Sequence, residues 1–236
     1  MIKLLLVLIG TCFLLLANAS PLQSSSPSVS WRYGVGSNID DIWSSKAEFF
    51  RHGRRFYADS GRGIYGAALS KDIIEKNYYW AGGGGLPTDG LPVPDQALIE
   101  MISFYDRKRY RIKVDLPANL AQQMKQVYQI AEKHDRRNRL YFGLAPGGYF
   151  EVLFTADNLL VKPDLLLARG IAEEVTDDWR DKIIPLSKQY KERWEEFSQE
   201  YDSTSKQYPV PLGMDWAPIM DAYRAKQPRT DQNPVR

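Results

Sequence analysis

Apolar and polar side chains alternate along several short stretches of the chain, and this period of two is what most restricts its fold. Between residues 29 and 35, Val, Trp, Tyr and Val alternate with Ser, Arg and Gly. Residues 110–114 repeat the alternation, with Tyr, Ile and Val against Arg and Lys. Such alternation predicts a β-strand with one buried and one solvent-facing side. The chain is therefore expected to be built mainly from half-buried antiparallel strands.

Other stretches add strands that are separated by turns. Residues 97–105 are apolar on both faces, and the turn Asp106-Arg107-Lys108 joins them to 110–114 as a predicted hairpin. A strand at 42–50 is expected to end at the turn Arg51-His52-Gly53. Further strands are expected at 140–144, 149–154, 159–161 and 165–175.

Two regions have helical periodicity instead. After Pro117, which can open a helix, apolar residues recur every three or four positions at Leu120, Met124, Val127 and Ala131. The second region has a stripe of the same spacing made of Trp179, Ile183, Leu186, Tyr190, Trp194, Phe197 and Tyr201. Pro185 interrupts it, which predicts a kink or two abutting helices. We expect the stripe to pack on the strands; a partner groove or dimer seam is the alternative.

Residues 1–19 have the three parts of a secretory signal peptide. Lys3 supplies a positive start, residues 4–16 are an apolar run, and Ala17-Asn18-Ala19 forms a small-residue cleavage site. The run is shorter than the ~20 residues that span a bilayer, so we expect cleavage and no stable membrane span. Cys12 follows Thr11 inside the run, which disfavours lipoprotein anchoring through Cys12. A periplasmic protein is therefore predicted.

Composition argues against several classes of protein. Cys12 is the single cysteine, so the mature chain is expected to lack disulfides and cysteine nucleophiles. The 31 Lys and Arg residues nearly balance the 29 Asp and Glu residues, which argues against a dedicated nucleic-acid-binding protein. The aromatic content of 12% suits both a core and a contact surface, so it does not decide between them.

The chemical motifs that the sequence offers are weak. Residues 81–85 (AGGGG) lack the lysine and the following helix of a phosphate-binding loop. Residues 145–148 (APGG) are typical of a turn, and no G-x-S-x-G nucleophile motif is present. His52 and His134 lie in charged stretches without metal-binding spacing. We therefore expect no catalytic, cofactor-binding or metal-binding residues, and we do not expect an enzyme.

The order of several short motifs resembles a known family. The motifs are YWAGGGG at 79–85, LPVP at 91–94, FY at 104–105, YRIKVDLP at 110–117 and FGLAPGG at 142–148. Over about residues 29–172 they resemble the bacterial envelope family called domain of unknown function 2931, whose members are mostly small lipoproteins. The resemblance implies an envelope protein and brings no catalytic residues.

The resemblance also has functional implications and limits. Some members of the family look like immunity proteins encoded beside secreted antibacterial lipase effectors. Members usually carry a lipidated cysteine at the signal junction, which this chain lacks. Residues 176–236 look like an added helical region.

Together these features predict an α+β fold. The expected architecture is a mainly antiparallel β-sandwich-like domain with one inserted helix and a C-terminal helical extension. The expected organisation is a signal peptide at 1–19, a flexible tether at 20–28, a β-rich domain at 29–175, and a helical extension at 176–236 that ends in a disordered tail.

The leading functional hypothesis is a non-enzymatic, periplasmic protein-binding module, in particular an immunity protein that neutralises a secreted lipase effector. Trp80, Trp179 and Trp194 are the candidate partner-binding residues, because buried aromatic anchors carry much of the energy of protein interfaces. A periplasmic hydrolase without a recognisable motif and a structural envelope component are the alternatives.

Overall fold

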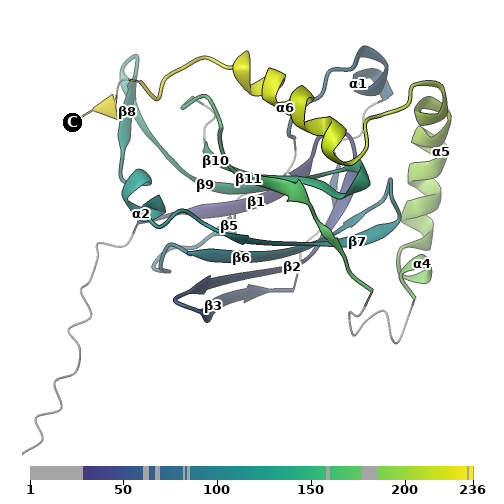
Figure 1. Cartoon of the computed structure of the whole chain (residues 1–236), viewed down its shortest axis with the longest axis horizontal. Coiled ribbons are helices and arrows are strands. Elements are labelled where there is room, and N and C mark those ends of the chain that lie inside the picture. The colour runs from purple at the N-terminus through teal and green to yellow at the C-terminus, as the bar shows by residue number, and fades with distance from the viewer. Residues whose placement is uncertain are drawn as a thin grey trace, which may run out of the picture.

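Two β-sheets pack face to face, and helices cover one end of the sandwich and one of its outer faces (Figure 1). This computed structural model describes residues 29–60, 64–66, 70–81, 83, 86–157, 160–176, 185–232 and 234–235. The predicted signal peptide at 1–19 and tether at 20–28 lie outside the described residues. The predicted α+β fold with two mainly antiparallel sheets is confirmed.

Sheet A has seven strands, with five in the order β11-β10-β9-β1-β5, while β8 pairs with β9 and β13 pairs with β8. Its strands are β1 Arg32–Ser37, β5 Leu86–Pro87, β8 Val127–Ile130, β9 Lys133–Ala145, β10 Tyr149–Ala156, β11 Leu165–Ile171 and β13 Pro234–Val235. β1 is parallel to β9, and the other pairs are antiparallel.

Sheet B has six strands, with five in the order β12-β7-β6-β2-β3, while β4 pairs with β2. Its strands are β2 Asp41–Arg51, β3 Arg54–Asp59, β4 Ile64–Gly66, β6 Gln96–Ser103, β7 Lys108–Asp115 and β12 Glu173–Glu174. The chain passes from β11 in sheet A to β12 in sheet B at Ala172. The predicted hairpin β6–β7 is confirmed. β2 ends near the expected turn at residues 51–53, and β3 pairs with it after that turn.

The main core lies between the two sheets. The alternating apolar residues of β1 face inward, and Trp31 meets Phe49 of β2 edge to face with ring centroids 5.1 Å apart. Phe142 of β9 and Ile99 of β6 are fully buried in the same cluster. Burying one such side chain stabilises the fold by roughly 1.5–3 kcal/mol relative to exposure. The period-two pattern therefore correctly predicted which side of β1 faces the core.

The helices form a second core outside the sandwich. They are α1 Ser70–Glu75, α2 Leu120–Gln123, α4 Leu186–Gln189, α5 Lys191–Gln207 and α6 Trp216–Ala225, with short 3-10 helices η1 Pro146–Gly148 and η2 Gly213–Asp215. α6 lies over the outer face of sheet A, and α5 stands across one end of the sandwich (Figure 1). Every helix in the described part of the chain is too short or too polar to cross a membrane.

The predicted aromatic stripe packs on the strands. α5 buries Trp194, Phe197 and Tyr201, and Trp194 packs against Phe104 after β6. The interruption lies at Tyr190 between α4 and α5, whereas Pro185 precedes α4 as its cap. Trp179 and Ile183 of the stripe lie outside the described residues.

The prediction of a helix from Pro117 to Ala131 is wrong for its second half. α2 is a single turn that ends at Gln123, and Val127 begins β8, which pairs with β9. Ala131 has a φ of 54° in the β8–β9 turn. A helix of this length is marginal by itself, whereas the ladder to β9 supplies inter-strand hydrogen bonds. The charged residues 133–139, expected to follow a helix, instead begin the longest strand.

Two other segments differ from the sequence prediction. Residues 160–161 are irregular rather than a strand. The C-terminal segment, expected to be disordered, makes defined contacts: Thr230 N–H donates to the Lys162 carbonyl at 2.8 Å, and Pro234-Val235 pair with β8.

Candidate functional site

Two neighbouring glycines lie on the outer face of sheet A beneath α6. Gly36 of β1 lies beside Gly143 of β9 in the sheet register. A Cβ atom on Gly143 would stand 2.5 Å from the Trp80 ring, so only glycine lets that ring lie on the strand. The Tyr141 hydroxyl lies against Gly36 and donates a hydrogen bond to the Ala81 carbonyl at 2.6 Å. The AGGGG segment thus begins as a loop held against these two glycines.

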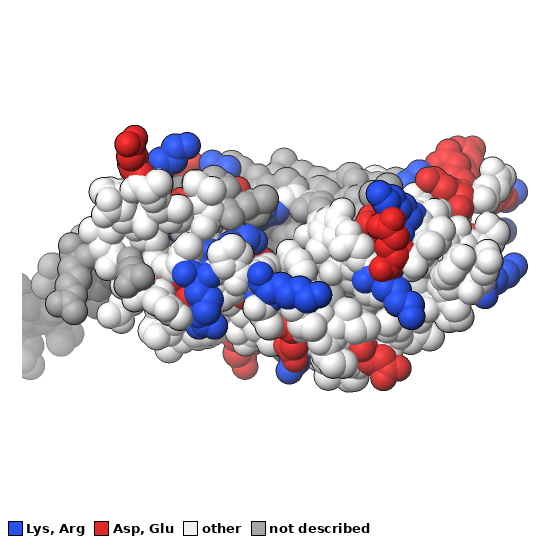
Figure 2. All heavy atoms as spheres, turned by 90° about the horizontal axis from the view of Figure 1, so that it is seen from above, with Lys and Arg blue, Asp and Glu red and all other residues white. Residues whose placement is uncertain are grey.

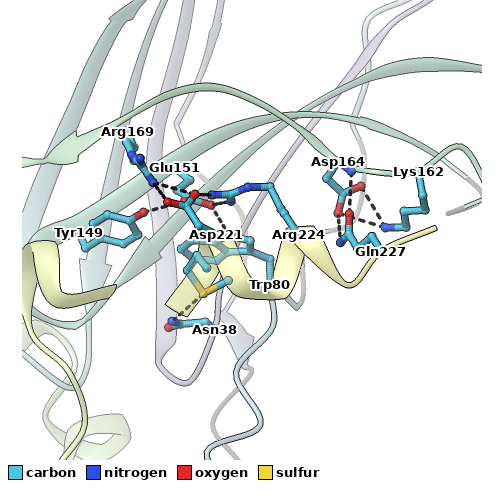
Figure 3. Close-up of polar contacts among 11 residues, drawn as sticks. Asn38, Trp80, Tyr149, Glu151, Lys162, Asp164, Arg169, Asp221, Arg224 and Gln227 are labelled. Carbon is cyan, nitrogen blue, oxygen red and sulfur yellow. Dashed lines mark hydrogen bonds and ion pairs between the residues drawn. The ribbon is translucent and has the colours of Figure 1, made fainter. Parts of the chain in front are cut away.

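Glu151 of β10 is the centre of a buried polar network on the same face (Figure 3). Its side chain is 0% exposed. One carboxylate oxygen accepts a hydrogen bond from the Tyr149 hydroxyl at 2.6 Å. The other accepts from the Trp80 indole N–H at 2.7 Å and from the Arg224 guanidinium of α6. Three elements therefore converge on one carboxylate.

The network continues from Arg224 to the surface. Arg224 also donates to Asp221, one turn earlier on α6, at 2.5 Å. Asp221 also accepts two hydrogen bonds from Arg169 of β11, at 2.8 and 2.9 Å. Figure 3 shows these side chains converging between α6 and the sheet. From Glu151 through Arg224 and Asp221 to Arg169, the charges alternate in sign.

The network also shifts the acidity of its members. Hydrogen bonds from Arg169 lower the pKa of Asp221, which keeps this carboxylate ionised. Burial, followed by the neighbouring Glu151, raises the pKa of the Tyr149 hydroxyl, which keeps Tyr149 a neutral donor. The arrangement is suited to fixing α6 on the sheet, because its hydrogen-bonding groups are directed at one another.

A second group of contacts fixes the chain after α6. Lys162 forms an ion pair with Asp164 at 3.0 Å, and Gln227 donates to Asp164 at 3.0 Å. On the face that carries α6, acidic and basic side chains are interspersed rather than segregated (Figure 2).

Two further buried carboxylates lie around the start of β2, and one of them attaches α5. Asp40 accepts from the Ser103 hydroxyl at 2.5 Å and from the Tyr105 N–H at 2.9 Å. Burial raises the pKa of Asp40 well above its usual range. Asp41 forms an ion pair with Arg193 of α5. Asp41 thus holds α5 against sheet B, as the Glu151 network holds α6 against sheet A, while Asp40 fixes the segment between β6 and β7.

A pocket of about 360 Å³ lies where α5 meets the β6–β7 turn. It is lined by Arg107, Lys191, Trp194, Glu195 and Ser198. Trp194 is only 7% exposed and forms part of the wall. Arg107 donates to the Ser198 hydroxyl at 2.7 Å, so part of the polar lining is already paired.

An exposed apolar patch lies at the end of β11. Ile171, Leu212 and Met214 are 51%, 52% and 49% exposed. A Cβ on Gly213, between Leu212 and Met214, would stand 3.5 Å from the Ile171 side chain, so Ile171 lies beside the segment that carries the other two residues. We call this set the apolar patch.

A family model described as protein of unknown function (DUF2931) matches residues 17–213. The chain belongs to this family. No curated protein and no solved structure matched the chain.

The DUF2931 match extends beyond the region of the motif resemblance. It includes α4 and α5, which corrects the view that residues from 176 onward are an addition to the family. It ends at Gly213, so Trp80, Tyr149, Glu151 and Arg169 of the buried network fall inside the match, while Asp221 and Arg224 follow it. α6 is thus the element of the network that lies beyond the matched region.

Of the three predicted partner-binding residues, the structure describes Trp80 and Trp194. The N–H of Trp80 is bound to Glu151 beneath α6, whereas Trp194 of α5 is buried against Phe104. Trp179 lies outside the described residues. Both residues belong to the hydrophobic cluster beneath the helices, and Trp194 also lines the pocket.

The two histidines lie apart from the pocket and from the Glu151 network. His52 is 81% exposed in the β2–β3 turn, with Nδ1 3.6 Å from the Asp95 carboxylate. His134 is exposed in β9, opposite Gln129 of β8. Among the described residues, no three His, Cys, Asp or Glu side chains gather as metal ligands.

Sequence reasoning did not identify the Glu151 network or the apolar patch. Glu151 follows Tyr149 in an apolar strand, and a lone acid there was the one available signal of a buried polar contact. Leu212 and Met214 follow two prolines and flank a glycine, a pattern that resembles an ordinary linker. Their meaning depends on Ile171, which only the fold brings beside them.

Proposed function

We propose that this chain is a non-enzymatic protein-binding module of the bacterial envelope, and that the apolar patch is its binding surface. More specifically, the chain is proposed to be an immunity protein that neutralises a secreted lipase by binding to it. The single observation that carries the proposal is the exposure of Ile171, Leu212 and Met214 where the end of β11 meets Gly213. Contiguous exposed apolar groups are favoured where another protein covers them.

The patch rests on a rigid support. The Trp216 indole N–H donates to the Pro146 carbonyl at 3.2 Å, which joins α6 to η1. Gly147 N–H donates to Asp106 at 2.8 Å, and the main chains of Gly147 and Gly213 are in close contact. A surface that is already ordered loses little conformational entropy on binding. These contacts support the patch as a binding surface.

The buried network supports a binding role in a different way. Glu151 receives hydrogen bonds from Tyr149, Trp80 and Arg224. A general acid or base must reach a substrate proton, whereas this carboxylate is fully buried beneath α6. This polar network therefore serves the stability of the fold, which leaves the apolar patch as the proposed binding surface.

The test uses the mature chain, residues 20–236, and the secreted lipase encoded beside its gene. We expect a stoichiometric complex in calorimetric titration and loss of lipase activity in that complex. The double variant Leu212→Asp/Met214→Asp should weaken binding by about 100-fold, because it places two charges in the interface.

Val235→Asp is the matched control, because Val235 is 40% exposed but lies at the opposite end of the molecule (Figure 1). It should bind as the wild type does. Absence of an adjacent lipase gene or of any complex would contradict the proposal, as would equal affinity of the double variant and the control.

A further inference from the structure

We propose that the partner contributes an extended segment that pairs with the free edge of β11 and lengthens sheet A by one strand. This inference rests on the proposed function, because it specifies how the partner covers the surface around the apolar patch. The occupant is a β-strand of another protein with an apolar side chain opposite Ile171.

β11 is an edge strand of sheet A, with β10 as its neighbour on one side. Ile171 pairs with Tyr149 and Gly170 with Phe150, and Ala172 N–H donates to the Gly148 carbonyl at 2.8 Å. Main-chain groups in an antiparallel strand point alternately to its two sides. The peptide groups of Gly170 therefore face β10, and those of Arg169 and Ile171 face the open side.

The open side has the character of a strand-pairing surface. Within the described part of the chain, no hydrogen bond engages the N–H of Arg169 or of Ile171. β11 reads LLLARGI, without the lysine or proline that commonly protects an edge. A bulge interrupts the register between Leu166 and Ala168, so the regular edge is the short segment from Ala168 to Ile171. Main-chain donors and acceptors in this arrangement are complemented by another extended main chain.

The edge and the apolar patch form one continuous surface, because Ile171 belongs to both. Directly opposed residues of neighbouring strands project from the same face of a sheet. The partner residue opposite Ile171 would therefore project onto the side where Leu212 and Met214 lie. Arg169 is already paired with Asp221 at 2.8 Å, so this edge presents a neutralised charge to the incoming strand.

The test compares Arg169→Pro with Arg169→Ala in titrations with the lipase encoded beside the gene. Both variants remove the side chain and its ion pair with Asp221. The proline alone removes the N–H on the open side and leaves the ladder to β10 intact, since edge strands tolerate proline in that orientation. We expect Arg169→Pro to bind about tenfold more weakly than Arg169→Ala. Thermal unfolding of both variants checks that each is folded.

Hydrogen exchange of the wild-type chain provides a second measurement that needs no variant. The amides of Arg169 and Ile171 should exchange quickly in the free chain and slowly in the complex. Equal affinities of the two variants, or fast exchange of these amides in the complex, would overturn strand pairing. The proposed function would still stand if Leu212→Asp/Met214→Asp abolished binding.

Two further outcomes are informative. Failure to form any complex would overturn both the proposed function and this inference. Light scattering of the chain alone should give a monomer. A dimer in which the Arg169 and Ile171 amides are already protected would show that a second copy occupies the edge, which would overturn pairing with a foreign strand.

Discussion

The Glu151 network and the apolar patch each include one residue of β11, and these two residues are only two positions apart. The two regions have opposite physical characters. Arg169 of β11 belongs to the network, where charged groups are paired beneath α6. Ile171 belongs to the patch, where apolar groups face solvent. Polar groups inside and apolar groups outside reverse the usual distribution. This contrast is the basis of our proposal that the first region serves stability and the second serves recognition.

The comparison predicts its largest effect at Glu151. Glu151→Ala leaves the Arg224 guanidinium, 10% exposed, without its buried partner. Loss of one member of a buried ion pair costs roughly 3–5 kcal/mol of unfolding free energy, which urea denaturation measures. Asp221→Ala is the control, because that carboxylate is 49% exposed and such surface pairs contribute about 0–1 kcal/mol. Equal losses for the two variants would show that the network is not the anchor of α6.

Two methionines provide a matched test of the two regions. Met220 of α6 is 0% exposed and Met214 of the patch is 49% exposed. Met220→Ala should lower the unfolding free energy by roughly 2–5 kcal/mol. Met214→Ala should change it by less than about 0.5 kcal/mol. If Met214→Ala were as destabilising, the patch would be part of the core and unsuited to a binding role.

A pH-dependent effect is expected at Asp40, the buried carboxylate beside α5. Because its folded pKa is raised, ionisation opposes folding as pH rises above the unfolded value of about 3.9. Asp40→Asn keeps an acceptor for the Tyr105 N–H but cannot ionise. Its stability relative to the wild type should therefore increase from pH 4 to pH 7. A constant difference across that range in parallel urea titrations would refute the assignment.

The smallest effect distinguishes the hairpin at Ala131 from the helix expected there. A left-handed alanine costs roughly 1–2 kcal/mol, and Ala131 has a φ of 54°. After the greater entropy of glycine in the unfolded chain is subtracted, Ala131→Gly should stabilise the protein by roughly 0.5–1 kcal/mol. In a helix the same change would destabilise it by about 1 kcal/mol. The sign of the change in melting temperature therefore decides between the two structures.

Local patterns predicted the parts of the fold that depend on local physics. Alternation at residues 29–35 identified β1 and its inward face, and the spacing of Trp194, Phe197 and Tyr201 identified the buried side of α5. The pattern from Leu120 to Ala131 was misleading, because Leu120 and Met124 are buried as predicted while Val127 pairs with a distant strand. Apolar spacing alone does not show which long-range hydrogen bonds are available.

The candidate site depends on contacts that no local pattern contains. Trp80 was singled out as an aromatic contact residue, but its N–H is bound to Glu151, 71 residues away in the sequence. Gly143 lies beneath its ring, and the pairing of β1 with β9 places Gly36 beside Gly143, where it makes room for Tyr141 and Ala81. Likewise, the apolar patch exists only where the end of β11 meets η2.

The most direct test of this division measures two quantities on two variants. Glu151→Gln and Leu212→Asp/Met214→Asp are each assayed for unfolding free energy and, at a temperature where both are folded, for affinity for the neighbouring lipase. We expect the first to lower stability and retain affinity, and the second to retain stability within about 0.5 kcal/mol while losing affinity about 100-fold. Affinity that falls with Glu151→Gln and survives the patch variant would contradict the account.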